Sequence, residues 1–272
     1  MVYPSKQIDL FEKEKSPSQI LRETIQSFPS VELRKGKIWH IGNVTPIDDI
    51  GIYFRVGRTS KYKIEVYQDG NFIDEEFDAA PYTHTLLDVE LEICAIAEKP
   101  KLSPKPKGIA NQLNRLLNQS EKGRQFRARF EMAEISDPED FITHIKHAIA
   151  IFKFWLTFSK PNPFDIDSEF NKPMGKLLYS VNGDKGKAEI KGENLNPERV
   201  EELARSAAST GEDAGAMLQL EPRTRSVKKN LKGNPVILAQ DDLDTRSQMK
   251  RLLKRMRDLY KKIRGRIEQN NE

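Results

Sequence analysis

Apolar and polar residues alternate through most of the segment from 31 to 98, and a period of two residues predicts β-strands. Two of these alternating runs flank Asp69-Gly70, a pair that favours the left-handed backbone of a tight hairpin turn. The later run from 85 to 99 is long enough for one bent strand or for two strands. We therefore expect an antiparallel β-meander in the N-terminal part of the chain.

Apolar residues recur at helical spacing in four other segments, which we expect to be helices. These segments are 16–28, 109–119, 137–148 and 196–211. Capping residues support three of them, namely Ser16 or Ser18, Asp137 followed by Pro138, and Asn196 with Gly211 at the far end. Strands are expected over 123–135, 151–159, 185–192, 214–222 and 233–238. The order strand–helix–strand therefore occurs twice, at 124–159 and at 185–221.

A segment rich in proline and lysine, KPKLSPKPKG at 99–108, follows the meander. This composition is typical of a loop or a linker. We expect two domains, a mostly β region over 1–106 and an α+β domain over 107–272 that ends in a basic helix. The expected fold class is α+β, with the N-terminal meander followed by the two strand–helix–strand units.

The helix expected at 246–265 combines an apolar stripe with a strongly basic remainder, and Asp244 or Thr245 can cap it. The stripe consists of Met249, Leu252, Leu253, Met256, Leu259, Tyr260, Ile263 and Ile267. Asp258 is the one acid among the many cations on the other faces. A solvated helix usually interleaves acids with bases, because opposite charges four residues apart contribute about 0.2–0.5 kcal/mol per pair. The stripe is expected to pack on the chain's own core or on a second copy of the helix.

The net charge of +4 is unevenly distributed along the chain. Residues 223–266 hold 15 Lys and Arg against 4 Asp and Glu, whereas residues 1–222 hold 30 against 35. A basic end on a near-neutral body attracts a polyanion to one region, so we expect nucleic acid to bind there. The expected contacts are Arg223, Arg225, Lys228, Lys229, Lys232, Arg246, Lys250, Arg251, Lys254, Arg255, Arg257, Lys261, Lys262 and Arg264. We expect the first five of these to lie on a loop that contacts phosphates.

Tyr260 is the one aromatic residue in this basic region, so the region shows no platform for stacking single-stranded bases. Contacts to the backbone of duplex DNA, with little readout of base sequence, are favoured instead, although RNA stays open. Two other interpretations of the basic amphipathic helix also stay open. It can bind a protein partner, or it can lie on an anionic membrane surface without inserting.

Motifs of known catalytic chemistry are absent from the sequence, and no cofactor is expected. It contains no glycine-rich nucleotide-binding motif, and its one cysteine, Cys94, forms no nucleophile pattern with the four histidines. His144 and His147 have the spacing of one edge of a metal site on a helix but lack a third ligand nearby, so no metal site is expected. The single cysteine, the lack of a run of about 18 apolar residues and the charged N-terminus favour a cytoplasmic protein.

One enzymatic alternative is a metal-dependent nuclease. Asp165 or Asp184 precedes Glu189 and Lys191, and Glu189-Ile190-Lys191 lies on an expected strand. Such nucleases place two carboxylates on Mg²⁺ with a lysine beside the attacking water. Whether the protein is an enzyme stays open, and the charge pattern favours a binding protein.

The order of segments carries a resemblance to a known family. An antiparallel N-terminal region is followed by VELEICAIAEKPKLSPKPKGIANQLNRLLN and RQFRARFEMAEISDPEDFITHIKHA, then by a PNP break, a second α+β unit and a terminal helix rich in Lys, Arg and Met. Over about residues 50–268 this order resembles the A component of the lambda Rex exclusion system and related small bacterial and phage defence proteins. The resemblance implies a cytoplasmic, two-domain, dimeric DNA-binding protein that acts against phage infection with a partner protein. No functional residue is carried over, because no motif matches position by position.

Overall fold

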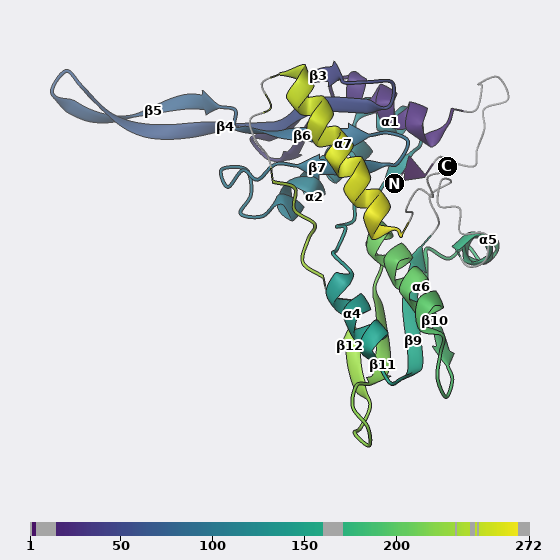
Figure 1. Ribbon diagram of the computed structural model, residues 1–272. Helices are drawn as coiled ribbons and strands as arrows, with labels where there is room; N and C mark the ends of the chain where they lie inside the picture. Colours follow the sequence, from purple (N-terminus) through teal and green to yellow (C-terminus); the bar gives the residue numbers. More distant parts are fainter. Residues whose placement is uncertain are drawn as a thin grey trace. The chain divides into compact units, whose positions relative to one another are not determined.

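The computed structural model describes residues 2–3, 15–159, 171–231, 233–239, 243 and 245–265 (Figure 1). The chain forms two compact units, Met1–Met132 with Gln240–Leu253 and Ala133–Ala239 with Lys254–Glu272. Helices and antiparallel sheets occur in both units, which confirms the α+β class expected from the sequence. No helix in the described part of the chain is long and apolar enough to cross a membrane.

The first unit is built on an antiparallel sheet with the strand order β2-β3-β4-β6-β7, to which β5 adds by pairing with β4. The elements of the unit are β1 (Val2–Tyr3), α1 (Pro17–Gln26), β2 (Ser30–Arg34), β3 (Lys37–Pro46), β4 (Gly51–Gln68), β5 (Asn71–Ala79), β6 (Tyr82–Asp88), β7 (Ile93–Ile96), α2 (Pro106–Gln119), α3 (Glu121–Gln125) and β8 (Arg129–Phe130). The meander is therefore confirmed, and the run from 85 to 99 forms parts of two strands.

The hairpin between β4 and β5 turns at the expected position. Asp69 and Gly70 have φ values of 50° and 83°, the left-handed conformation that such a two-residue turn requires. Beyond Ser60 the only paired neighbour of β4 is β5. The segment Lys61–Asp78, which we name the arm, is therefore a two-stranded ribbon that extends past the rest of its sheet (Figure 1).

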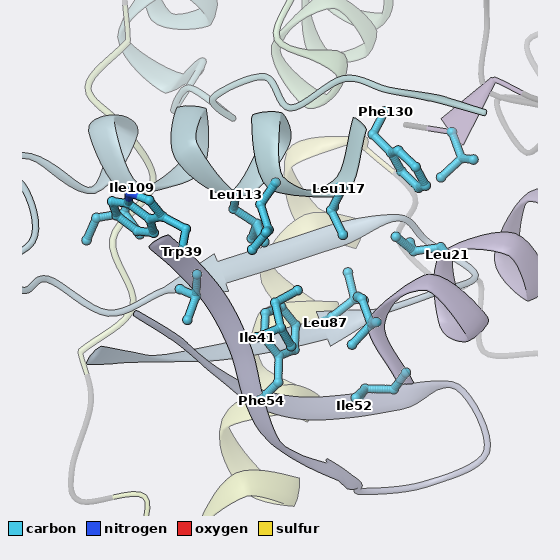
Figure 2. Packing of buried hydrophobic residues seen from close by; sticks show 14 of the residues in the cluster. Leu21, Trp39, Ile41, Ile52, Phe54, Leu87, Ile109, Leu113, Leu117 and Phe130 are labelled. Atoms are coloured by element: carbon cyan, nitrogen blue, oxygen red, sulfur yellow. The ribbon is translucent and has the colours of Figure 1, made fainter. Parts of the chain in front are cut away.

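Helix α2 closes the core of the first unit. Ile109, Leu113 and Leu117 of α2 lie against apolar side chains of the sheet, such as Ile41 and Phe54 (Figure 2). All five are at most 3% exposed. The helix that we placed at the start of a second domain, after residue 106, thus belongs to the first unit, because its apolar face needs this sheet.

The second unit is a four-stranded antiparallel sheet with the order β10-β9-β11-β12. Its elements are α4 (Glu139–His147), β9 (Ala150–Ser159), α5 (Asn171–Ser180), β10 (Lys185–Lys191), α6 (Pro197–Thr210), β11 (Ala214–Gln219) and β12 (Val227–Asn230). Helices α4 and α6 share a buried core with Phe154 and Leu156 of β9 and Ala216 of β11. One face of this sheet is therefore covered by helices.

Capping residues set the ends of the helices as expected in most cases. The Ser16 side chain accepts a hydrogen bond from the Gln19 backbone N–H, and the Gln19 side-chain oxygen accepts one from the Ser16 backbone N–H, which completes a capping box. Asn196 caps α6 at its start, and Gly211 ends it with a left-handed φ of 71°. Asp137 accepts from the Glu139 N–H at 3.0 Å, although Pro138 is the residue at the cap position.

The strand expected over 123–135 is wrong for most of its length. Ser120 caps the short helix α3 by accepting from the Gly123 N–H at 3.0 Å, so the chain is helical where alternation predicted a strand. Only Arg129–Phe130 pairs, and its partner is β1. The first of the two strand–helix–strand units therefore begins with a strand of two residues, whereas β10–α6–β11 is confirmed.

Two further expectations near the C-terminus are wrong. The segment 233–238 forms no strand; only Pro235 makes an isolated bridge, with Ser136, because proline has no N–H to donate to a ladder. Conversely, Val227–Asn230 lies in a segment that we interpreted as a phosphate-contacting loop, and it pairs with β11 as strand β12. This segment is mostly polar and lacks the apolar alternation that predicts a strand.

Candidate nucleic-acid interface

The basic C-terminal helix is α7 (Arg246–Ile263). Thr245 fixes its start, because Thr245 and Gln248 exchange hydrogen bonds between side chain and backbone, at 2.8 and 3.3 Å. The guanidinium of Arg246 also donates to the carbonyl oxygen of Ile47 at 3.2 Å. The alternative cap, Asp244, lies outside the described residues.

The apolar stripe of α7 is buried within a single chain. Leu253 is 0% exposed and Met256 is 6% exposed. Tyr260 and Ile263 are also buried, and Ile263 belongs to the same apolar cluster as Ala204 of α6. The stripe therefore packs on the chain's own core, so no second copy of the helix is needed to cover it.

The opposite side of α7 carries exposed cations, which we name the basic face. Its members are Arg246, Lys250, Arg251, Lys254, Arg255 and Lys262. Lys250, Arg251 and Lys254 form no ion pair with any other residue that the structure describes. Arg255 donates to the carbonyl oxygen of Ala239 at 3.2 Å, which leaves its charge unneutralised. The basic face is therefore a row of exposed cations on the side of α7 away from its buried stripe, and the exposed carboxylate of Asp258, four residues from both Lys254 and Lys262, interrupts it.

The other expected contacts on α7 are less accessible. Arg257, Lys261 and Arg264 are half-buried, and the Arg264 guanidinium lies 5.6 Å from the centre of the Tyr260 ring. Such a cation–π contact stabilises the end of the helix and does not need a ligand. We therefore restrict the candidate interface on α7 to the basic face.

The expected contacts from 223 to 232 lie on separate elements. Arg223 and Arg225 are exposed in the segment that joins β11 to β12. Lys228 and Lys229 lie on β12, and the Lys228 ammonium is 5.0 Å from the centre of the Trp155 indole. Lys232 lies outside the described residues. Lys228 therefore belongs to the sheet of the second unit and not to the basic face.

Sequence reasoning missed the cations that surround Trp155. Lys153 lies on the same strand, and the Lys187 ammonium of β10 is 5.7 Å from the indole centre. Part of the signal lies in the run 151–159, where the buried residues Phe154, Leu156 and Phe158 occupy every second position. The residues between them alternate onto the other face of the sheet.

The described residues contain no cluster of metal ligands of the kind that a metal-dependent nuclease needs. Glu189 accepts from the ammonium groups of Lys153 and Lys191, each at 3.2 Å, and these hydrogen bonds lower the pKa of its carboxyl. No three His, Cys, Asp or Glu side chains gather to hold a metal there. Asp165, one of the proposed ligands, is not among the residues described.

The remaining candidate groups have local partners. His147 bonds to the carbonyl oxygen of Thr143 through Nδ1, and His144 lies 3.9 Å from the carboxylate of Asp140. Burial raises the pKa of the Cys94 thiol to about 12, so the thiol stays protonated and is a poor nucleophile.

Comparison with known proteins identifies no family for this chain. No protein-family model matches the chain, and no curated protein matches it. The interface therefore has to be interpreted from its own residues.

Proposed function

We propose that the protein binds duplex DNA without sequence specificity, through the basic face of α7. The observation that carries the proposal is a row of exposed cations, without ion pairs among the described residues, on a helix whose apolar stripe is already buried. Phosphates relieve the repulsion between cations along a helix, and these cations release the counterions that are condensed on DNA, which favours binding. The basic face offers Lys and Arg but no Asn or Gln, so contacts to phosphate outweigh readout of base edges.

The salt dependence of binding tests this proposal. Fluorescence anisotropy would be measured with two labelled duplexes of unrelated sequence, between 50 and 200 mM salt. If six to ten phosphates are contacted, the affinity for both duplexes falls by about 10³- to 10⁵-fold over this range. A preference for one sequence, or an affinity that does not change with salt, would contradict the proposal.

A role in anti-phage defence, together with a second defence protein, is part of the same proposal and rests on the resemblance in segment order. A protein that coats DNA through its phosphates does not need to recognise a particular phage sequence. The proposal extends to a homodimer, and a separate feature of the structure supports that extension.

That feature is the apolar side of the arm. Strand pairing places Tyr62 opposite Phe77 and Val66 opposite Ile73, all on one side of the ribbon with Ile64. Tyr62 is 60% exposed and Phe77 is 46% exposed. A two-stranded ribbon is marginally stable alone, and an exposed apolar side of this kind marks an interface.

We infer that a second copy of the chain covers the apolar side of the arm. The arm and its flanking residues, Ser60–Ala79, hold two lysines against six acids, so this surface repels nucleic acid. The pairs of charged residues lie on the other side of the ribbon, where Lys61 bonds to Glu76 at 3.1 Å. Glu75, opposite Ile64, is the one charged residue on the apolar side. Two identical apolar sides can therefore pack about a twofold axis without bringing the charged pairs together.

Sedimentation velocity tests the dimer with a matched pair of variants. Replacing Tyr62 and Phe77 with threonine keeps the strand propensity but removes the central aromatic pair, and should weaken the dimer by about 30-fold or more. The control replaces Tyr67 and Phe72, a second cross-strand aromatic pair that lies on the other side near the turn. An intact chain that stays monomeric at micromolar concentration, or equal weakening by the control, would contradict the dimer.

A further inference from the structure

The sheet of the second unit has one face covered by helices and one face that carries polar side chains. Phe154, Leu156 and Ala216 point into the core shared with α4 and α6. Because side chains alternate along a strand, Lys153 and Trp155 of β9 point to the opposite face. Trp155 is only half-buried there. This opposite face, which we name the open face, is distinct from the basic face of α7.

Strand pairing shows which residues join Trp155 on the open face. Glu189 of β10 and Gly215 of β11 are its direct cross-strand neighbours. The ammonium groups of Lys187 and Lys228 approach the indole from the two edge strands, at 5.7 and 5.0 Å from its centre. One aromatic ring therefore lies at the middle of the sheet, between two exposed lysines on opposite edges.

Gly215 provides the space that the indole occupies. A Cβ atom at this position would lie 2.1 Å from Cζ2 of Trp155, far inside van der Waals contact. The six-membered part of the indole thus extends over β11, towards Lys228. A glycine in a strand interior weakens the strand, so its presence beneath the ring indicates that the position of the ring matters.

The charge of the open face is positive. Lys153 and Lys191 share the carboxylate of Glu189, which is the one acid opposite Trp155, whereas Lys187 and Lys228 contact only the indole among the described residues. A cation–π contact at an exposed site is weak, about 0.5–1 kcal/mol. Both ammonium groups can therefore leave the ring and bind an anion, which is a stronger partner, at little cost in free energy.

We propose that the open face binds single-stranded nucleic acid, with one base stacked on Trp155 and the flanking phosphates held by Lys187 and Lys228. An aromatic ring on the surface of a sheet can stack only with bases that are not already stacked and paired in a duplex. Lysines on either side of the ring match a strand whose phosphates run past the stacked base. This site lies on a different surface from the duplex contact and does not depend on it.

Tryptophan fluorescence tests the site directly. The other tryptophan, Trp39, is 4% exposed in the core of the first unit, so a change in emission on binding reports Trp155. A thymidine oligonucleotide of about 12 residues would be titrated into the intact chain. We expect quenching that saturates and that weakens as salt is added. Binding measured by anisotropy without any quenching, or quenching by poly-glutamate equal to that by the oligonucleotide, would overturn the proposal.

Substitutions separate stacking from a general loss of structure. Trp155→Leu retains apolar bulk without a stacking face and should weaken oligonucleotide binding by about 5- to 150-fold, whereas Trp155→Phe should restore most of it. Lys228→Gln removes no buried atom and should lower the slope of log affinity against log salt by about 0.7. Trp155→Leu should leave duplex affinity unchanged. Equal binding by the leucine and phenylalanine variants, or an unchanged slope for Lys228→Gln, would overturn the proposal.

Discussion

Replacing Lys250, Arg251, Lys254 and Arg255 with glutamine should lower the affinity for duplex DNA by up to about 10³-fold at 0.15 M salt. The four side chains are exposed on one side of α7, at spacings of three and four residues that keep them together along the helix. Each phosphate contact contributes about 0.9 to the slope of log affinity against log salt, so the slope should fall by about 3 to 4. Glutamine preserves length and helix propensity, so the fold should not change.

The matched control for this variant removes the same number of charges elsewhere. Lys61, Lys63, Lys107 and Lys176 are exposed and lie outside α7. Replacing these four with glutamine should leave both the affinity and the salt slope nearly unchanged. If the control weakens binding as much as the α7 variant, then net charge and not the basic face determines affinity.

Leu253→Ala should lower the free energy of unfolding by about 2–5 kcal/mol, the largest stability effect that we expect. Leu253 is completely buried in the middle of α7, and removing its branched end leaves a cavity that rigid neighbours cannot fill. Urea denaturation would measure the loss. Ile237→Ala is the control, because Ile237 is 79% exposed and its truncation should change the free energy of unfolding by less than about 0.5 kcal/mol.

A small loss for Leu253→Ala would contradict the view that α7 is part of the folded core. The same burial determines how the basic face can be studied. A chain that ends before α7 would lose the buried stripe together with the cations, so weak DNA binding by such a truncation would not identify the contact. Charge-neutralising substitutions at exposed positions of α7 avoid this ambiguity.

Local signals in the sequence were sufficient for much of the fold. The Asp69-Gly70 turn, the capping residues Ser16 and Asn196, and the stripe of α7 each depend on residues close in the chain, and each was predicted correctly. Alternation misled us around α3, because a single capping bond from Ser120 stabilises a short helix that a period of two cannot reveal.

The candidate sites differ in how far the sequence could predict them. The basic face lies on one continuous helix, so helical spacing alone brought its cations together. The open face needs four strands in register, and the residues around Trp155 come from Lys153 to Lys228, 75 positions apart. The polar residues of β12 lack the alternation that predicts a strand, so Lys228 was assigned to a loop. The contact between Lys228 and Trp155 was therefore not predicted.

The most direct test of duplex binding is a lysine footprint. The intact chain would be acetylated under limiting conditions with and without a saturating duplex, and each lysine would be quantified by mass spectrometry. Bound DNA should protect Lys250, Lys254 and Lys262, while Lys61 and Lys63 on the acidic arm should react equally in both states. Full reactivity of the three α7 lysines in a DNA-saturated sample would contradict the central claim that the basic face of α7 contacts the phosphate backbone.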